Sequence, residues 1–226
     1  MAGRTGQGVS IAVVDSGVHA GHPHVGGISG GAGIDADGAV SDDVVDRLGH
    51  GTAVAAAIRE KAPGAALWAV KVFDRSLTAT GQALVAGIGW AARQRVQIIN
   101  LSLGTTNHDH ETRLAAAVAL ATECGAIVVA AAPQKEAAWL PGGLSGVVAV
   151  ELDWTCPRDE CRVAIEDDGS VRLSASGYPR PIPGVAPARN FSGPSFAVAN
   201  ATGLLALVIE GQPVQTTALL AQRLRQ

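Results

Sequence analysis

Short apolar runs that alternate with longer helical segments are the feature of this sequence that most constrains its fold. Residues 9–14 read Val-Ser-Ile-Ala-Val-Val, a β-rich run that stops at the turn signal Asp15-Ser16-Gly17. Strands that alternate with helices predict a mostly parallel central sheet with helices on both faces, a three-layer α/β fold. The predicted strands span residues 9–14, 67–73, 97–103, 126–132 and 146–150, and the predicted helices span 52–61, 80–94, 111–123, 194–209 and 214–225.

Three segments depart from this alternation. Residues 19–48 are rich in Gly, Asp and His, and residues 178–189 carry four prolines, so both are predicted to be loops. Residues 162–166 and 171–175 flank Asp-Asp-Gly-Ser and predict a β-hairpin. No linker, repeat or low-complexity tract divides residues 1–226, and we therefore predict a single domain.

The composition excludes several classes of protein. Hydrophobic residues make up 47% of the chain and charged residues 16%, which excludes intrinsic disorder. A net charge of −3 without a basic block argues against a nucleic-acid partner, and no apolar run approaches the roughly 20 residues of a membrane span. The chain shows no apolar signal peptide, and its three cysteines are too few for a disulfide scaffold. We therefore expect a cytoplasmic protein.

Reactive side chains stand among small residues in three short segments. These are Asp15-Ser16-Gly17, Gly49-His50-Gly51-Thr52 and Gly193-Pro194-Ser195-Phe196-Ala197. A serine hydroxyl needs a neighbouring imidazole to take its proton, and the imidazole needs a carboxylate to hold its tautomer and stabilise its cation. In open parallel sheets the functional site lies beyond the carboxyl ends of the strands, where Asp15 is predicted to stand. The three segments together therefore predict nucleophilic catalysis.

The order and context of these motifs resemble those of the subtilisin-like serine proteases, the subtilase family (peptidase family S8). The similarity covers nearly the whole chain. It implies a subtilisin-like fold and a serine endopeptidase that hydrolyses peptide bonds through an acyl-enzyme. The segments that carry it are Gly8 to Val18, His22-Pro23, Gly49 to Ala55, Ala69 to Asp74, Ile98 to Gly104, Ser192 to Ala197 and Thr202-Gly203.

The resemblance also assigns roles to residues. Asp15 is expected to orient the base, His50 to act as general base and acid, and Ser195 to be the nucleophile. The Ser195 backbone N–H, at a helix N-terminus, is expected to donate to the developing oxyanion. The substrate is expected to bind as an added strand, with the side chain before the scissile bond in a neighbouring pocket. The expected substrate-binding residues are Leu101, Ser102, Leu103, Gly104, Ala131 and Ala132.

Two positions depart from the family pattern. Pro194 precedes the nucleophile where the family usually has Thr, and proline is tolerated in the first turn of a helix. Pro133-Gln134 stands where the family has Gly-Asn, whose Asn side chain donates to the oxyanion. Glutamine carries the same amide one methylene further out, so Gln134 is the predicted second donor. The alternative is a weak or inactive pseudoprotease that keeps the fold and binds peptides.

Other clusters of titratable residues have simpler interpretations. The histidines at positions 19, 22 and 24 lie in a Gly-rich segment and are expected to be loop residues, not metal ligands. His108, Asp109 and His110 are expected to form a solvated loop. No cofactor is predicted from the residues, because the acidic loop lacks the spacing of an EF-hand calcium site. The resemblance to the family leaves calcium binding open. Its carboxylates are Asp35, Asp37, Asp42, Asp43 and Asp46.

The remaining predictions concern cysteines, substrate and partners. Cys156 and Cys161 either close a small disulfide loop or form half of a metal site, and Cys124 is predicted to be a small buried hydrophobe. By analogy, a compact protease without a pro-domain suits a narrow substrate, such as a precursor peptide or one partner protein. The C-terminal helix, with Leu219, Leu220 and Leu224, could pack on a partner protein.

Overall fold

The computed structural model describes residues 3–133, 139–186, 189–212 and 214–225. Within these residues the strands are β1 (Ser10–Asp15), β2 (Gly30–Ile34), β3 (Val40–Ser41), β4 (Ala66–Lys71), β5 (Ile98–Leu101), β6 (Ile127–Ala131), β7 (Val147–Leu152), β8 (Cys161–Ile165) and β9 (Val171–Ala175). They form one sheet in the order β3-β2-β4-β1-β5-β6-β7-β9-β8. The outermost pair at each edge is antiparallel, and the strands between are parallel.

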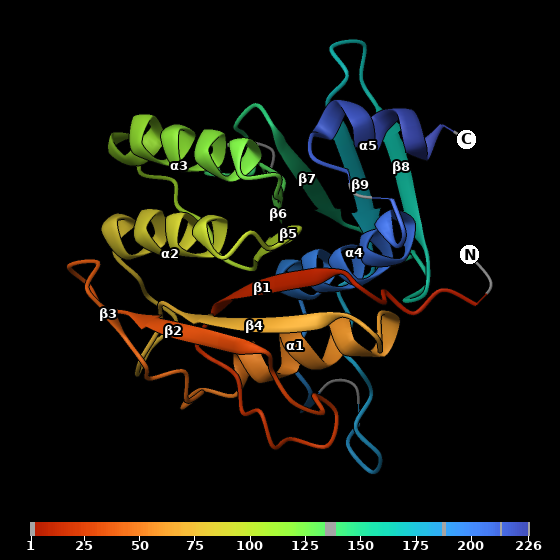
Figure 1. The fold of residues 1–226 in the computed structure, drawn as a ribbon. Coiled ribbons are helices and arrows are strands. Elements are labelled where there is room, and N and C mark those ends of the chain that lie inside the picture. The colour runs from red at the N-terminus through yellow and green to blue at the C-terminus, as the bar shows by residue number, and fades with distance from the viewer. Residues whose placement is uncertain (1–2, 134–138, 187–188, 213, 226) are drawn as a thin grey trace.

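Helices cover both faces of this sheet (Figure 1). On one face lie α1 (His50–Lys61), α4 (Pro194–Ile209) and α5 (Thr217–Leu224), and on the other lie α2 (Gly81–Arg93) and α3 (Glu111–Glu123). The predicted three-layer, mostly parallel α/β fold is therefore confirmed. No helix of the described ranges is both long enough and apolar enough to span a bilayer.

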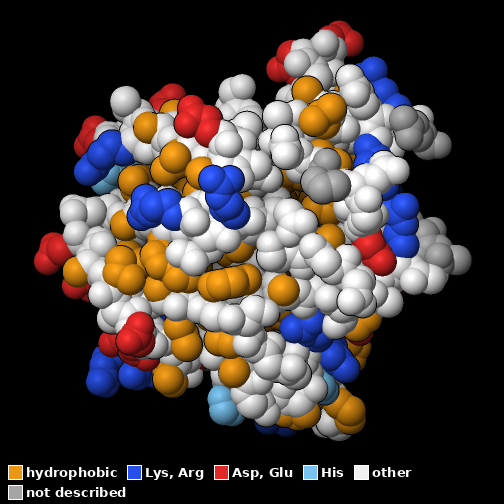
Figure 2. Space-filling view, viewed as in Figure 1, with side chains coloured by type: hydrophobic (Ala, Val, Ile, Leu, Met, Phe, Trp, Pro, Cys, Tyr) orange, Lys and Arg blue, Asp and Glu red, His pale blue; other side chains and the backbone are white. Residues whose placement is uncertain are grey.

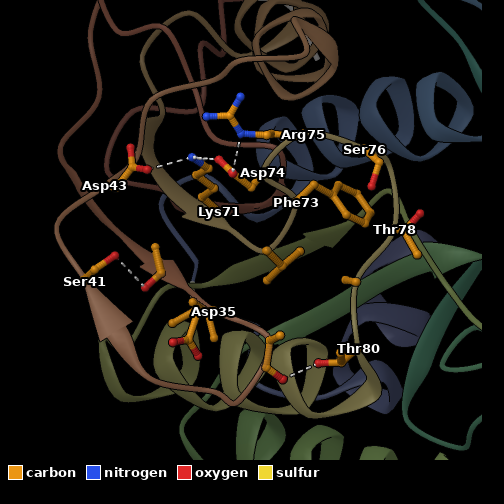
Figure 3. Close-up of a pocket in the computed structure, with 15 residues that line it drawn as sticks. Asp35, Ser41, Asp43, Lys71, Phe73, Asp74, Arg75, Ser76, Thr78 and Thr80 are labelled. Carbon is orange, nitrogen blue, oxygen red and sulfur yellow. Dashed lines mark hydrogen bonds and ion pairs between the residues drawn. The ribbon is translucent and has the colours of Figure 1, made fainter.

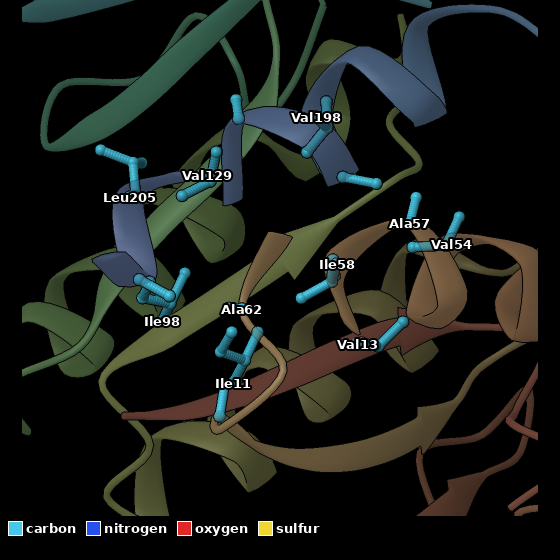
Figure 4. Close-up of a cluster of buried hydrophobic side chains, with 14 of the residues drawn as sticks. Ile11, Val13, Val54, Ala57, Ile58, Ala62, Ile98, Val129, Val198 and Leu205 are labelled. Atoms are coloured by element: carbon cyan, nitrogen blue, oxygen red, sulfur yellow. The ribbon is translucent and has the colours of Figure 1, made fainter. Parts of the chain in front are cut away.

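The inner strands bury both of their faces. In β1, Ile11 and Val13 pack toward the α1 and α4 layer, while Ala12 and Val14 pack toward the α2 and α3 layer. Figure 4 shows the first of these clusters, where side chains from β1, α1 and α4 meet. A strand covered on both sides is apolar throughout, which is why these strands were recognisable as continuous apolar runs.

The second cluster reaches the molecular surface between α2 and β4. Figure 2 shows hydrophobic side chains gathered where these two elements come together. Trp68 of β4 and Trp90 of α2 contact each other there, with ring centroids 6.2 Å apart, and both are partly buried. The two partly buried tryptophans thus cover the surface side of the cluster between the sheet and α2.

The prediction that residues 19–48 form a single loop is wrong, because the segment contains β2 and β3. Three of the five residues of β2 are glycine, and glycine has low strand propensity. The reason for them is close approach: a Cβ atom on Gly31 would lie 2.3 Å from the Ala69 carbonyl oxygen. Gly30 is likewise required by Trp68 of β4, and Gly33 by Ser41 and Asp43, so the reasons for the glycines lie in other segments and local sequence carries no strand signal here.

The other predicted elements are present, with ends shifted by no more than three residues. The predicted hairpin is β8 and β9, which pair antiparallel. At the C-terminus, α5 packs Leu220 and Ala221 onto the first core cluster and leaves Leu219 46% exposed. Most of the apolar face of α5 is therefore covered by its own domain.

Candidate active site

Asp15 and His50 are hydrogen-bonded at the carboxyl end of β1. Asp15 is the last residue of β1 and is fully buried, and His50 is the first residue of α1. The His50 Nδ1 atom lies 2.8 Å from Asp15 Oδ1 and 3.0 Å from Asp15 Oδ2. Because a carboxylate only accepts hydrogen bonds, Nδ1 carries the proton and Nε2 keeps a free lone pair. The ring is thus held in the tautomer that a general base requires.

The approach of α1 to β1 depends on a glycine. A Cβ atom on Gly51 would lie 2.2 Å from the Gly17 carbonyl oxygen and 3.1 Å from Asp15 Cβ. The Gly51 N–H donates to Ser16 Oγ at 2.9 Å, which fixes the helix start against the turn after β1. A larger residue at position 51 would push His50 away from Asp15.

Asp46 ties the start of α1 to the same turn, a role that the sequence reasoning missed. One of its carboxylate oxygens accepts hydrogen bonds from Ser16 Oγ and from two backbone N–H groups in the turn before α1. The other accepts from the N–H and Oγ1 of Thr52. The Thr52 N–H is one of the amides that the first turn of a helix leaves without an internal partner. Asp46 lies three residues before Gly49, the N-cap of α1, and so outside the position at which a capping residue is recognised in a sequence.

Opposing effects act on the pKa of His50. Burial of the ring disfavours the imidazolium, whereas the hydrogen bond and charge of Asp15 and the charge of Asp46 favour it. The carboxylates prevail, and the pKa of His50 is raised above its ordinary value of 6.5. Phe191 and Phe196 flank the imidazole, with ring centroids 5.8 Å and 5.7 Å from its own.

Ser195 is the second residue of α4. Pro194 takes the first helical position, where a missing N–H costs little. Gly193 before it has a φ of 134°, a conformation that favours glycine, although nothing lies within 4 Å of the place a Cβ would take. The first N–H inside the helix therefore belongs to Ser195, where the helix dipole is positive.

Ser195 and His50 line the same cavity of about 440 Å³, but they are not hydrogen-bonded to each other in the described part of the chain. The Ser195 hydroxyl instead donates to the Ser102 carbonyl oxygen at 3.1 Å. The Ser102 hydroxyl in turn lies 3.4 Å from the Ser195 carbonyl oxygen. To donate to His50, the Ser195 hydroxyl has to give up this hydrogen bond.

A buried asparagine joins this strand end to α4. Asn100 of β5 donates from Nδ2 to Ser102 Oγ at 2.9 Å and accepts at Oδ1 from Thr202 Oγ1 at 3.0 Å. Both Asn100 and Thr202 are fully buried, so these bonds have no competition from water. They connect the segment that carries Ser102 to the helix that carries Ser195.

The predicted substrate-binding residues fall into two groups. Leu101 ends β5, and the three residues after it line the cavity with His50 and Ser195. Ala131 and Ala132 lie at the end of the next strand, β6, outside the lining of this cavity. The predicted oxyanion donor Gln134 lies outside the described residues. The lining residues from the predicted set are Ser102, Leu103 and Gly104.

Two carboxylates of the acidic loop, Asp43 and Asp46, have hydrogen-bond partners within the chain. Figure 3 shows Lys71, whose side chain is nearly buried, pointing to Asp43 and Asp74 beside a cavity of about 510 Å³. Lys71 Nζ lies 2.8 Å from Asp43 and 3.0 Å from Asp74. Hydrogen bonds from Lys71 and Arg47 hold the pKa of Asp43 well below its usual range. Asp46 accepts hydrogen bonds from Thr52 at the start of α1.

The other predicted clusters also have internal partners. No group of three or more His, Cys, Asp or Glu within the described ranges is arranged to hold a metal ion. His22 Nδ1 accepts a hydrogen bond from the His24 backbone N–H at 3.2 Å. Cys156 is buried and Cys124 and Cys161 half-buried, all as free thiols, and burial raises the pKa of Cys161 to about 12. The segment His108–His110 forms a short 3₁₀ turn before α3.

Comparison with known proteins identifies the family. A model of the subtilase family (Peptidase S8) matches residues 6–151, a range that contains Asp15 and His50 and ends before Ser195. The match covers more than half of the chain, and the chain belongs to the subtilase family.

Named relatives are similar along almost the whole chain. A thermostable alkaline protease of Halalkalibacterium halodurans is 32% identical over 98% of this chain and 62% of its own length. The minor extracellular protease Epr of Bacillus subtilis is 31% identical over 99% of this chain and 35% of its own length. The chain thus spans about three fifths of the first relative and about a third of the second.

Solved structures agree with the fold. Sphericase, 25% identical, superposes with a TM-score of 0.72 over 98% of this chain and 83% of its own. The nisin leader peptidase NisP from Lactococcus lactis superposes with a TM-score of 0.71 at 18% identity, over 98% of this chain and 82% of its own, a likeness of fold alone.

Proposed function

We propose that this chain is a serine endopeptidase in which Asp15, His50 and Ser195 form the catalytic triad. The observation that carries the proposal is the buried Asp15–His50 hydrogen bond at the rim of a cavity that Ser195 also lines. Membership of the subtilase family, and relatives that are named proteases, give it further support. Asp15 ends β1, His50 begins α1 and Ser195 lies in the first turn of α4.

The reaction proceeds in two balanced steps. Ser195 Oγ attacks the substrate carbonyl carbon while its proton passes to His50 Nε2, and the peptide C–N bond then breaks as His50 returns that proton to the leaving amine. A water molecule next attacks the acyl-enzyme with His50 again as base, and Ser195 regains its proton when the acid leaves. Asp15 stabilises the imidazolium formed in both steps.

Two donors stabilise the negative oxygen of the tetrahedral intermediate. The Ser195 backbone N–H is the first N–H of α4 and lies at the positive end of the helix dipole. It donates a hydrogen bond to the oxygen of the reacting carbonyl. The second donor that we propose is the side-chain amide of Gln134, as the sequence predicts. The family's asparagine donor is worth about 10² to 10³ in kcat in subtilisin, and we borrow that figure for the scale of the effect.

Substrate binding prepares the nucleophile. A peptide that adds a strand along the residues after β5 donates a backbone N–H to the Ser102 carbonyl. Without a substrate, that carbonyl accepts the Ser195 hydroxyl at 3.1 Å. The bound peptide supplies the carbonyl with another donor, which favours release of the hydroxyl toward His50. Attack and binding are thereby coupled through one oxygen atom.

We propose that the substrate specificity is narrow and that the substrate is a precursor peptide or a single partner protein. Contact between α5 and a partner protein stays a prediction. In α5 the exposed apolar side chain is Leu219, since Leu220 is buried in the core. Mass spectrometry of products from a peptide library, with the Ser195→Ala variant as control, tests the narrowness. Cleavage at many unrelated sequences would contradict it.

A fluorophosphonate probe tests the catalytic proposal directly. The probe forms a bond between phosphorus and Ser195 Oγ with loss of fluoride, and mapping of the adduct should identify Ser195. The Ser192→Ala variant is the matched control, because Ser192 is an exposed serine in the same turn and its loss should leave labelling in place. Absence of an adduct on Ser195 at inhibitor excess would favour the alternative, a peptide-binding pseudoprotease.

A further inference from the structure

The indole of Trp139 lies on Gly104, in the space that a side chain at position 104 would occupy. A Cβ atom built on Gly104 would be 2.2 Å from Trp139 Nε1 and 2.6 Å from Trp139 Cε2. Thr105 and Leu140 exchange backbone hydrogen bonds of 2.8 Å in both directions, and this pairing holds the two segments side by side. Trp139 is therefore fixed against the strand end that the substrate is expected to use.

The position of the nucleophile relates Trp139 to the substrate. Trp139, Gly104 and Ser195 line one cavity, and Ser195 Oγ lies 3.1 Å from the Ser102 carbonyl. A carbonyl carbon under attack must come within about 3 to 3.5 Å of Ser195 Oγ, so the residue that carries it lies beside Ser102. The side chain of that residue, called P1 below, then extends along the wall formed by Gly104, where the indole already stands.

Packing alone keeps the indole in this place. The Nε1 atom of Trp139 is buried and has no hydrogen-bond partner among the described residues. Within the described part of the chain the N–H contributes no directional bond, and the bulk of the aromatic ring occupies the space. A phenylalanine would fill most of the same volume, whereas an alanine would leave it empty.

We propose that Trp139 determines P1 specificity by limiting P1 to glycine, alanine or serine and excluding leucine and aromatic residues. The inference rests on the proposed function, since it assumes that Ser195 is the nucleophile. A difference of one methylene in an apolar pocket changes kcat/KM by about 10- to 200-fold, and a leucine or phenylalanine side chain exceeds the smallest residues by more than one methylene. The substrate class is thus a peptide cleaved after a small residue.

Diphenyl phosphonate analogues of glycine, alanine, leucine and phenylalanine test this limit without knowledge of the natural sequence. Each reacts by forming a bond between phosphorus and Ser195 Oγ with loss of phenoxide, and the second-order rate reports the fit of its P1 side chain. In the wild-type protein the glycine and alanine analogues should react about 10-fold faster or more than the phenylalanine analogue. The Trp139→Ala variant should raise the rate for phenylalanine by a similar factor, and Trp139→Phe should keep the wild-type order.

Labelling of every variant with a small alkyl fluorophosphonate separates the two proposals. If Ser195 is not labelled in the wild type, the proposed function fails. If Ser195 is labelled but the phenylalanine analogue reacts as fast as the glycine analogue, or the glycine analogue does not react, the role of Trp139 is wrong. An unaltered rate ratio in labelled Trp139→Ala would also overturn it, and the wild-type ratio and the Trp139→Phe variant decide the question if Trp139→Ala does not fold.

Discussion

His50 and the helix that carries it are held by several hydrogen bonds, whereas the Ser195 hydroxyl donates to a single backbone carbonyl, that of Ser102. On the His50 side, Asp15 accepts from the imidazole, and Asp46 and Ser16 bind the first turn of α1. On the Ser195 side, the bond from Oγ to the Ser102 carbonyl at 3.1 Å must be given up before attack. In the proposed mechanism the base is thus pre-organised, and the nucleophile becomes aligned when a peptide binds.

This difference separates two costs that a protease must meet. The base carries a buried charge pair during the reaction, and a buried charge requires partners that are already oriented. The nucleophile is a neutral hydroxyl with one rotatable bond, so its reorientation costs little and can wait for the substrate. Substitutions on the His50 side should therefore have larger effects on the chemical step than substitutions around Ser102.

Loss of the base should have the largest effect. His50→Ala should lower kcat by about 10⁶-fold, because Ser195 then has no acceptor for its proton, a size borrowed from the subtilisin triad. Peptide hydrolysis and fluorophosphonate labelling both measure it. His108→Ala is the matched control, since His108 is exposed and contacts Glu111. Comparable losses in both variants would contradict a specific role for His50.

Loss of the orienting carboxylate should come next. Asp15→Asn should lower kcat by about 10⁴-fold, because an amide no longer selects the tautomer with the proton on Nδ1. In the wild type, kcat/KM should decrease as the pH is lowered, because the base must be neutral. The midpoint of this acid limb should lie above pH 6.5, since the pKa of His50 is raised. In Asp15→Asn, burial still lowers the pKa of His50, but the main charge that opposes this effect is gone. The acid limb should therefore move to lower pH. A limb that stays in place would exclude the Asp15 charge as the cause.

Asp46 should matter less, and through His50. Asp46→Asn removes a charge that raises the pKa of His50, so the acid limb should move to lower pH by less than in Asp15→Asn. The pKa of Asp46 is lowered, since hydrogen bonds from Thr52, Leu48 and Ser16 outweigh its burial. The contribution of the Asp46 carboxylate to stability is therefore fully present at pH values above 3.8, its ordinary pKa. It is lost as the pH falls through the lowered pKa of the folded state.

The stability effect of Asp46 is measurable separately from activity. Denaturant unfolding of Asp46→Ala at neutral pH should show a loss of about 0.5 to 2 kcal/mol, the usual cost of replacing a capping side chain by alanine. Asp42→Ala is the control, because Asp42 is an exposed carboxylate of the same loop. Equal stability of the two variants would mean that Asp46 does not anchor α1.

The smallest effect on catalysis is expected at the link between β5 and α4. Thr202→Val keeps the shape of the side chain but leaves the buried Asn100 Oδ1 without its donor at 3.0 Å. The free energy of unfolding should fall by about 1 to 3 kcal/mol, the cost of an unsatisfied buried acceptor. If the nucleophile is aligned by substrate, kcat should change by less than about 10-fold. A loss as large as that of Asp15→Asn would show that the Ser195 side is pre-organised after all.

Much of this molecule could be predicted from short segments. β1, α4 and the other inner elements carry their own apolar patterns, because both faces of each inner strand are buried. The motifs around Asp15, His50 and Ser195 could be recognised for a similar reason: each needs small residues immediately beside it. The Gly51 contact with Gly17 explains why the histidine motif has to contain glycine.

Other features were decided by tertiary structure alone. Glycine-rich β2 is a strand because β4 lies against it, and the bond from Ser195 to Ser102 joins residues 93 positions apart. The place of Trp139 on Gly104 likewise depends on the pairing of Leu140 with Thr105. A sequence determines its local periodicities and the residues flanking a motif, because those act over a few residues. Contacts between distant segments depend on the order of strands in the sheet, and only the folded chain establishes that order.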